Sequence, residues 1–205
     1  EFTTLDIETD DYNKPVTISA LKQVFNINTK QFETVAQFQR FYQAANRDLK
    51  VTYSTHGLTS QKLQKLRSQY FKASGERLAK RYNKGEQEAL REFLGSSIVV
   101  GQNVVDFDMY HLFRGDTGNQ TIDIMNAARV LWPGQPNSLG DIFRRLFGMS
   151  MEDAGLPHHI SSSDVIATSL ITQKLMSMSN DVGKAMRFVA VTPGTHLTQM
   201  DTVLG

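Results

Sequence analysis

The first forty residues contain three segments whose apolar pattern is typical of β-strands. Residues 2–8 form a short apolar run that predicts a buried strand. Residues 16–27 follow Pro15 and are rich in β-branched and aromatic side chains, and residues 32–42 have a similar composition. An Asn-Thr-Lys turn separates these two segments, although residues 32–42 could also form a helix. We therefore predict that the chain begins with consecutive strands.

After residue 56 the apolar residues recur mainly at helical spacing. Short buried strands are expected only within residues 96–103 and at the start of residues 121–131. Capping residues and a closing Gly mark several helix ends. The helices are predicted from Thr59 or Ser60, over 86–94 and 106–113, within 121–131, from Asn137 or Ser138 to Gly148, and over 161–178. Strands followed by alternating strands and helices predict an α/β fold, with one mixed sheet flanked by helices.

The composition is that of a globular protein. The chain has 205 residues, enough for one large domain or at most two small ones. It has no cysteine, which excludes disulfides and thiolate metal sites, and no apolar run as long as a membrane span. We therefore expect no membrane partner and a cytoplasmic location. The first predicted strand starts directly after Glu1, which suggests a piece of a longer protein.

Two acids stand one residue apart at the end of the first predicted strand. Side chains alternate along a strand, so Asp6 and Glu8 project from the same face while Ile7 faces the other side. Adjacent carboxylates repel each other and resist burial unless a cation lies between them. The pair is therefore either half of a divalent-metal site or part of a solvated turn, since Asp10 and Asp11 follow.

The net charge is only +1, but basic residues gather in one stretch. Residues 62–91 contain nine Lys and Arg against three Glu, a surplus of six. A basic surface near an acidic pocket would suit a polyanion handled with metal ions, whereas a solvated helix face is the alternative. Lys80, Arg81 and Lys84 cluster around a predicted loop and are our candidates for contact with a nucleic-acid strand.

Four further polar residues follow predicted elements later in the chain. Asn103 and Asp108 come just after the buried strand within 96–103. His159 precedes Asp164 by five positions, and Asp164 lies in the first turn of the last predicted helix. Taken singly, each Asp could be an acid favoured by a helix dipole, and the His could be an ordinary surface residue.

The order of these residues resembles the DEDD superfamily of 3′–5′ exonucleases, in its histidine branch (DEDDh). The matching motifs are Asp-x-Glu-Thr after a strand, Asn followed by Phe-Asp, and His-x4-Asp. They correspond to Asp6, Glu8 and Thr9, to Asn103, Phe107 and Asp108, and to His159 and Asp164. HGLT at residues 56–59 and the run at residues 122–148 are also similar to the family. The resemblance covers about residues 2–178.

The resemblance implies a ribonuclease H-like fold and a cage of four acids for two Mg2+ or Mn2+ ions. By this resemblance Asp6 bridges both ions, Glu8 and Asp164 complete one of them, and Asp108 holds the other through water. His159 is implied as the base that orients and deprotonates the attacking water, and its near-neutral reference pKa suits that role. Oxygen ligands are those that Mg2+ and Mn2+ prefer.

The implied substrate is the 3′ end of single-stranded DNA or RNA. By the resemblance Thr9 meets the terminal nucleotide, and Asn103 braces the site. The spacing from Asn103 to Asp108 is one residue longer than is commonest in the family, and His158 directly precedes the expected His. These two departures leave the assignment of the second and third motifs open.

Two function classes remain open on the sequence alone. The first is an exonuclease, and the second is a catalytically weak nucleic-acid-binding or proofreading domain that keeps the fold. A proofreading role would require a polymerase partner, which the chain does not reveal. We expect an exonuclease domain over residues 1–179 and a C-terminal extension of unknown role over 180–205, where a small hairpin or the start of a further segment is predicted.

Overall fold

A six-stranded mixed sheet forms the centre of the molecule. The computed structural model describes residues 1–44, 57–114, 118–157, 160–178 and 190–191. Within these residues the strand order is β3-β2-β1-β4-β5-β6. β1 pairs in parallel with β4, and β4 in parallel with β5, whereas β2, β3 and β6 pair antiparallel to their neighbours. The strands are β1 (Phe2–Thr9), β2 (Pro15–Asn26), β3 (Gln31–Phe41), β4 (Ile98–Gly101), β5 (Thr121–Asp123) and β6 (Ala190–Val191).

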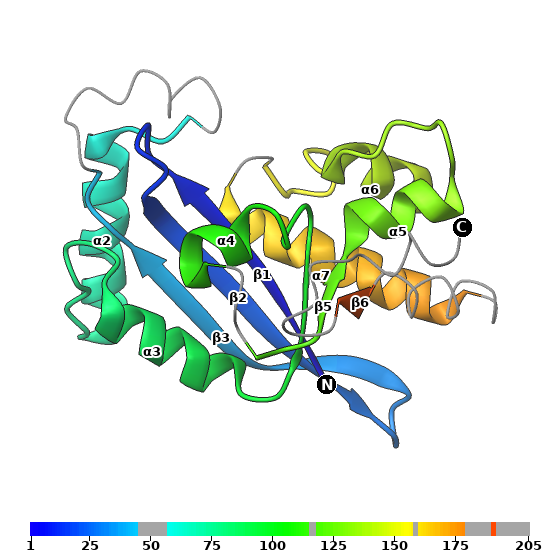
Figure 1. Cartoon of the computed structure of the whole chain (residues 1–205), viewed down its shortest axis with the longest axis horizontal. Coiled ribbons are helices and arrows are strands. Elements are labelled where there is room, and N and C mark those ends of the chain that lie inside the picture. The colour runs from blue at the N-terminus through cyan, green and yellow to red at the C-terminus, as the bar shows by residue number, and fades with distance from the viewer. Residues whose placement is uncertain (45–56, 115–117, 158–159, 179–189, 192–205) are drawn as a thin grey trace.

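Helices lie on both faces of this sheet. They are α2 (Ser60–Ser74), α3 (Lys84–Leu94), α4 (Asp108–Phe113), α5 (Ile124–Leu131), α6 (Leu139–Phe147) and α7 (Ser161–Ser177). In Figure 1, α3 and α4, drawn in green, lie in front of the sheet, and α7, drawn in orange, passes behind it. The α/β class with a mixed sheet flanked by helices, predicted from the sequence, is confirmed.

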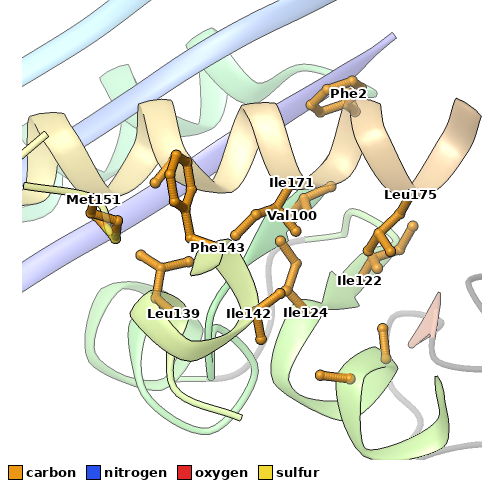
Figure 2. Packing of buried hydrophobic residues seen from close by; sticks show 13 residues of the cluster. Phe2, Val100, Ile122, Ile124, Leu139, Ile142, Phe143, Met151, Ile171 and Leu175 are labelled. Carbon is orange, nitrogen blue, oxygen red and sulfur yellow. The ribbon is translucent and has the colours of Figure 1, made fainter. Parts of the chain in front are cut away.

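Two apolar cores occupy the two faces of the sheet. One contains Leu5 and Ile7 of β1 together with buried side chains of α3 and α4. The other joins Phe2 of the same strand to α5, α6 and α7. In Figure 2, Phe143 of α6 and Ile171 of α7 take part in this second core. Because β1 contributes to both cores, its backbone and the direction of its side chains are fixed from both sides.

Polar side chains cap the start of four helices, and two of these caps, Thr59 and Ser138, are among the residues that the sequence predicted. The side chains of Thr59, Asn83, Asp123 and Ser138 each accept a hydrogen bond from a backbone N–H in the first turn of α2, α3, α5 and α6. These contacts satisfy donors that have no partner within the helix. At the other end of α6, Gly148 adopts a left-handed φ of 73°, which a residue without a Cβ takes at little cost.

Most predicted elements are confirmed, and two helix starts are corrected. Residues 31–41 form a strand and not a helix. α3 begins at Lys84 and not at residue 86, because Asn83 caps it, so Lys84 belongs to the first helical turn and not to the preceding loop. α4 begins at Asp108 and not at residue 106, because Asn103 adopts a left-handed φ of 56° and a turn occupies the intervening residues.

Only two residues beyond 179 are described. Ala190 and Val191 form β6, which pairs antiparallel with β5 at one edge of the sheet. The rest of 180–205, and the hairpin expected there, lie outside the described residues. None of the helices in the described part of the chain has the length and apolar character needed to cross a membrane.

Candidate metal centre

The central strand β1 carries two of the predicted acids on one face. Residues two apart along the strand share a face, so Asp6 and Glu8 lie on the same side as Thr4. Thr4 donates a hydrogen bond of 3.1 Å from its Oγ1 to the backbone carbonyl of Val165 in α7. This contact fixes β1 against the first turns of α7 and brings the two acids close to that helix.

Asp164 approaches this pair from the first turn of α7. The start of the helix is also held to β2 by a 2.9 Å hydrogen bond between the hydroxyls of Ser19 and Ser161. One carboxylate oxygen from each of Asp6, Glu8 and Asp164 lies within 4.8 Å of the others. Residues separated by more than 150 positions in the chain therefore converge on one acidic cluster.

Asp108 is held next to this cluster through the backbone of β1. Its Oδ1 accepts a 2.8 Å hydrogen bond from the backbone N–H of Ile7, which lies between Asp6 and Glu8. Asp108 is buried and is the first residue of α4. β4 pairs in parallel with the first half of β1, with Val100 opposite Thr4, so the loop after β4 leads Asp108 to the carboxyl edge of the parallel strands, where open α/β sheets bind their ligands.

The turn after β4 is tightly packed against β1. A Cβ placed on Gly101 would lie 2.8 Å from the carbonyl oxygen of Leu5 and 2.6 Å from the Cβ of Val104. Only glycine allows this close approach without a shift of the backbone. Gly101 therefore contributes to the position of Asp108 through the path of the chain.

Sequence reasoning noted Asp123 as the Asp of the family-like run but predicted no contact for it. Its Oδ1 accepts hydrogen bonds from the backbone N–H of Asn103, at 3.0 Å, and of Met125, at 2.9 Å. It therefore joins the turn that leads to Asp108 to the start of α5. The available signal was an Asp at the junction of a short strand and a helix, which predicts a cap but not a contact with a turn 20 residues earlier.

Burial and mutual repulsion make the ionised form of these acids costly. Burial raises the pKa of Asp6 well above its usual range, and the neighbouring Asp108, Glu8 and Asp164 raise it further. Burial, with Asp164 and Asp108, raises the pKa of Glu8 from 4.5 to about 8. Burial also raises the pKa of Asp108, against the effect of the hydrogen bond from Ile7.

A bound divalent cation explains this group of buried acids better than protons shared among the carboxylates alone. Asp6 Oδ2 is buried without a hydrogen-bond partner among the residues that the structure describes. An orphaned carboxylate oxygen is costly unless a cation satisfies it. The donor set consists of carboxylate oxygens, the hard ligands that Mg2+ and Mn2+ prefer. The cluster can therefore hold such ions.

The remaining predicted site residues lie in different parts of the structure. Thr9 is partly buried at the end of β1, and Asn103 contributes a backbone contact that braces the turn before Asp108. Lys80, Arg81 and Lys84 are exposed, and the two last line a groove that also contains Asp10. His159 and the neighbouring His158 lie outside the described residues.

Comparison with known proteins shows which solved structures share the fold of this chain. No family model matches the sequence, and a search of curated proteins also finds no match. Among solved structures, exonuclease X in complex with 5′-overhanging duplex DNA superposes with a TM-score of 0.55 at 16% identity, covering 91% of this chain and 99% of that protein. E. coli exonuclease I in complex with a dT13 oligonucleotide gives a TM-score of 0.63 at 14% identity and 92% coverage of this chain.

A third match broadens the comparison. A 3′-exonuclease that recognises the 3′ end of a histone mRNA stem-loop gives a TM-score of 0.52 at 13% identity, covering 85% of this chain and 80% of that protein. The present chain spans 44% of the length of exonuclease I. The chain therefore has the fold of these exonucleases, which is the ribonuclease H-like architecture that the resemblance implied.

Proposed function

We propose that this protein is a metal-dependent 3′–5′ exonuclease of the DEDDh type that hydrolyses single-stranded DNA or RNA. The observation that supports this most strongly is the convergence of Asp6, Glu8 and Asp164 on one cluster, with Asp108 bound to the intervening backbone. The fold shared with exonucleases supports the same reading. The proposal assigns a function to a costly arrangement of buried acids that stability alone does not explain.

The four acids are the proposed ligands of two divalent ions. We assign Asp6 to both ions, Glu8 and Asp164 to the first, and Asp108 to the second through water. When bound, such a pair of ions activates the attacking water and stabilises the leaving 3′ oxygen of a phosphodiester. The hydrogen bond from the Ile7 N–H holds the Asp108 carboxylate in position in the absence of an ion.

His159 is the proposed general base. A neutral imidazole accepts a proton from water near neutral pH, and His159 precedes the proposed ligand Asp164 by five residues in the sequence. Thr9 and the end of β1 are proposed to meet the terminal nucleotide. Asn103 braces the turn that carries Asp108, because its N–H is bound to Asp123.

The proposed partner is single-stranded nucleic acid, and a polymerase partner stays a prediction of the proofreading alternative. The domain limits of 1–179 and 180–205 also stay predictions. A nucleic-acid-binding domain without catalysis is the second candidate function. It differs from the first in a single measurable property, because it would bind the same strand without releasing nucleotides.

The test is hydrolysis of DNA and RNA oligonucleotides labelled at either end, with Mg2+, Mn2+ or EDTA. We expect a 3′ label to be released as a mononucleotide at once, a 5′ label to pass through a ladder of shortening products, and EDTA to stop both reactions. Asp6→Asn should be inactive, whereas Glu152→Gln, which neutralises an exposed acid between α6 and α7, should match the wild type. Binding without release, or release from the 5′ end, would contradict the proposal.

A further inference from the structure

A large groove lies outside the acidic cluster. It has a volume of about 1010 Å3 and lies between three parts of the chain: the turn from β1 to β2, the segment around the start of α3, and α4. Asp10, which lies in its lining, follows Glu8 by two residues, and α4 begins with Asp108. Two walls of the groove therefore continue directly from segments that build the candidate metal centre.

The groove is lined by cations from each of its three walls. They are Lys14 from the turn, Arg81 and Lys84 from the second wall, and Arg114 from the end of α4. Lys84 forms an ion pair with Glu88 at 3.9 Å, but both side chains are highly exposed, so this pair holds Lys84 only weakly.

One acid in the lining offsets only part of this charge. Asp10 is the acid in the lining, and its buried Oδ1 accepts the backbone N–H groups of Tyr12 and Lys14. Four cations therefore face one carboxylate in the lining of the groove. The positive field also acts on His111, since burial and the neighbouring Arg114 and Lys14 lower the pKa of its imidazole.

The loop that presents Arg81 is held in one conformation. The guanidinium of Arg67 donates hydrogen bonds to the carbonyls of Leu78, at 2.9 Å, and Ala79, at 2.7 Å, and also to that of Phe41. The carbonyl of Lys80 accepts a 2.8 Å bond from the backbone N–H of Gln43. Three consecutive carbonyls are thus bound before the chain reaches Arg81, which lowers the entropy cost of using this side chain in binding.

Exposed aromatic rings complete the lining. Tyr12 is 61% exposed and Tyr110 is 50% exposed, and both face a groove with cations on every wall. Cations that follow a backbone, combined with aromatic surfaces on which bases stack, are the usual features of single-strand binding surfaces.

We propose that this groove binds the phosphate backbone of a single nucleic-acid strand several nucleotides to the 5′ side of the bond that is cleaved. The proposal rests on the proposed exonuclease function for the direction of the strand. Charges spread over three elements fit successive phosphates of an extended chain better than the one phosphate group of a mononucleotide. Of the three cations predicted from the sequence to contact the strand, Arg81 and Lys84 line the groove and Lys80 does not. The structure adds Lys14 and Arg114 to this lining.

The test compares a groove variant with a control of equal charge. The groove variant carries Lys14→Gln, Arg81→Gln and Arg114→Gln. The control carries three such changes at exposed positions of α2 that do not line the groove: Lys62→Gln, Lys65→Gln and Lys72→Gln. Binding of fluorescent dT12 and dT3 is measured by anisotropy in EDTA over a range of salt, with thermal melts of each variant to verify folding.

We expect the groove variant to raise the Kd for dT12 at least tenfold and that for dT3 much less. Each lost phosphate contact on a single strand lowers the slope of log K against log salt by about 0.7, so the slope should fall by about 2. The slope for the control should differ from the wild-type slope by no more than the roughly 0.7 expected for one phosphate contact. Equal slopes for the wild type and the groove variant, or equally tight competition by a mononucleotide, would overturn the proposal.

The outcome for the groove is separable from that for the exonuclease function. A wild type that binds dT12 through the groove but releases no nucleotide with Mg2+ or Mn2+ supports the groove and refutes the exonuclease. A wild type that releases nucleotides, with a groove variant that binds dT12 normally, refutes the groove alone.

Discussion

The raised pKa of Glu8 leads to a quantitative prediction for the stability of the metal-free protein. Replacing Glu8 by Gln removes one carboxylate that burial and the neighbouring Asp164 and Asp108 keep from ionising easily. Its size and shape are nearly unchanged, so packing against β1 and α7 is preserved. We therefore expect Glu8→Gln to stabilise the chain in EDTA at neutral pH, although it deletes a proposed ligand.

The magnitude follows from the shift in the pKa. A folded-state pKa of about 8, against an ordinary value of 4.5, favours the protonated acid in the folded chain. Glu8 therefore lowers the free energy of unfolding of the wild type. This loss is absent below the unfolded-state pKa of 4.5, grows as the pH rises towards the folded-state pKa of about 8, and is about 3 kcal/mol at pH 7. In a chain of this size that corresponds to a melting temperature about 6–12 °C higher for the variant. Sharing of protons among the acids reduces this, so we expect at least a few degrees.

The assay is a series of thermal melts in EDTA from pH 4 to pH 8. The difference in Tm between Glu8→Gln and the wild type should be near zero at pH 4 and should increase with pH. Adding Mn2+ should stabilise the wild type more than the variant, because the wild type has the additional ligand. The exposed Glu152→Gln serves as the control and should show neither effect. A variant that is less stable than the wild type in EDTA at pH 7, or a difference in Tm that is independent of pH, would show that the Glu8 carboxylate is not destabilising in the metal-free protein.

Three other substitutions test separate parts of the site. Asp108→Asn should abolish nucleotide release while circular dichroism shows a folded protein, and retained activity would remove Asp108 from the metal centre. His159→Ala should lower kcat by roughly 10²–10⁴-fold with little change in the Kd for Mn2+, and His158→Ala should have a mild effect, so reversed effects would shift the motif by one residue. Gly101→Ala should destabilise the chain by about 1–3 kcal/mol in urea unfolding, because the added Cβ meets the backbone of β1. Gly85→Ala is its control, because its Cβ would approach only the Asn83 side chain, at 3.3 Å, and unfolding at the wild-type urea midpoint for Gly101→Ala would contradict the packing argument.

The face shared by Asp6 and Glu8 was predictable because strand geometry leaves no choice. A period of two places both side chains on one side whatever the rest of the fold does. That Asp108 and Asp164 belong to the same site could be inferred only from the family resemblance. No local sequence pattern indicates that α4 and α7 meet at the end of β1. The contacts that bring them there, from Ile7 and Thr4, join residues 101 and 161 positions apart.

Features that depend on tertiary contacts could not be obtained from the sequence. Asp123 has the pattern of a helix cap, but its second role requires the turn at Asn103 to pack beside it. Arg67 lies in the basic stretch and has the sequence character of a surface residue, yet it binds carbonyls on two other segments. A basic residue can place its charge in solvent or bind carbonyl groups, and only the fold distinguishes these cases.

The most direct test of the metal centre is anomalous diffraction from crystals soaked in Mn2+. We expect two anomalous peaks roughly 4 Å apart at the carboxyl end of β1, with Asp6 contacting both and Glu8, Asp108 and Asp164 around them. Peaks found only elsewhere, or an acidic cluster that stays free of Mn2+ while the crystal binds it at other sites, would contradict the claim that these four acids form a metal centre.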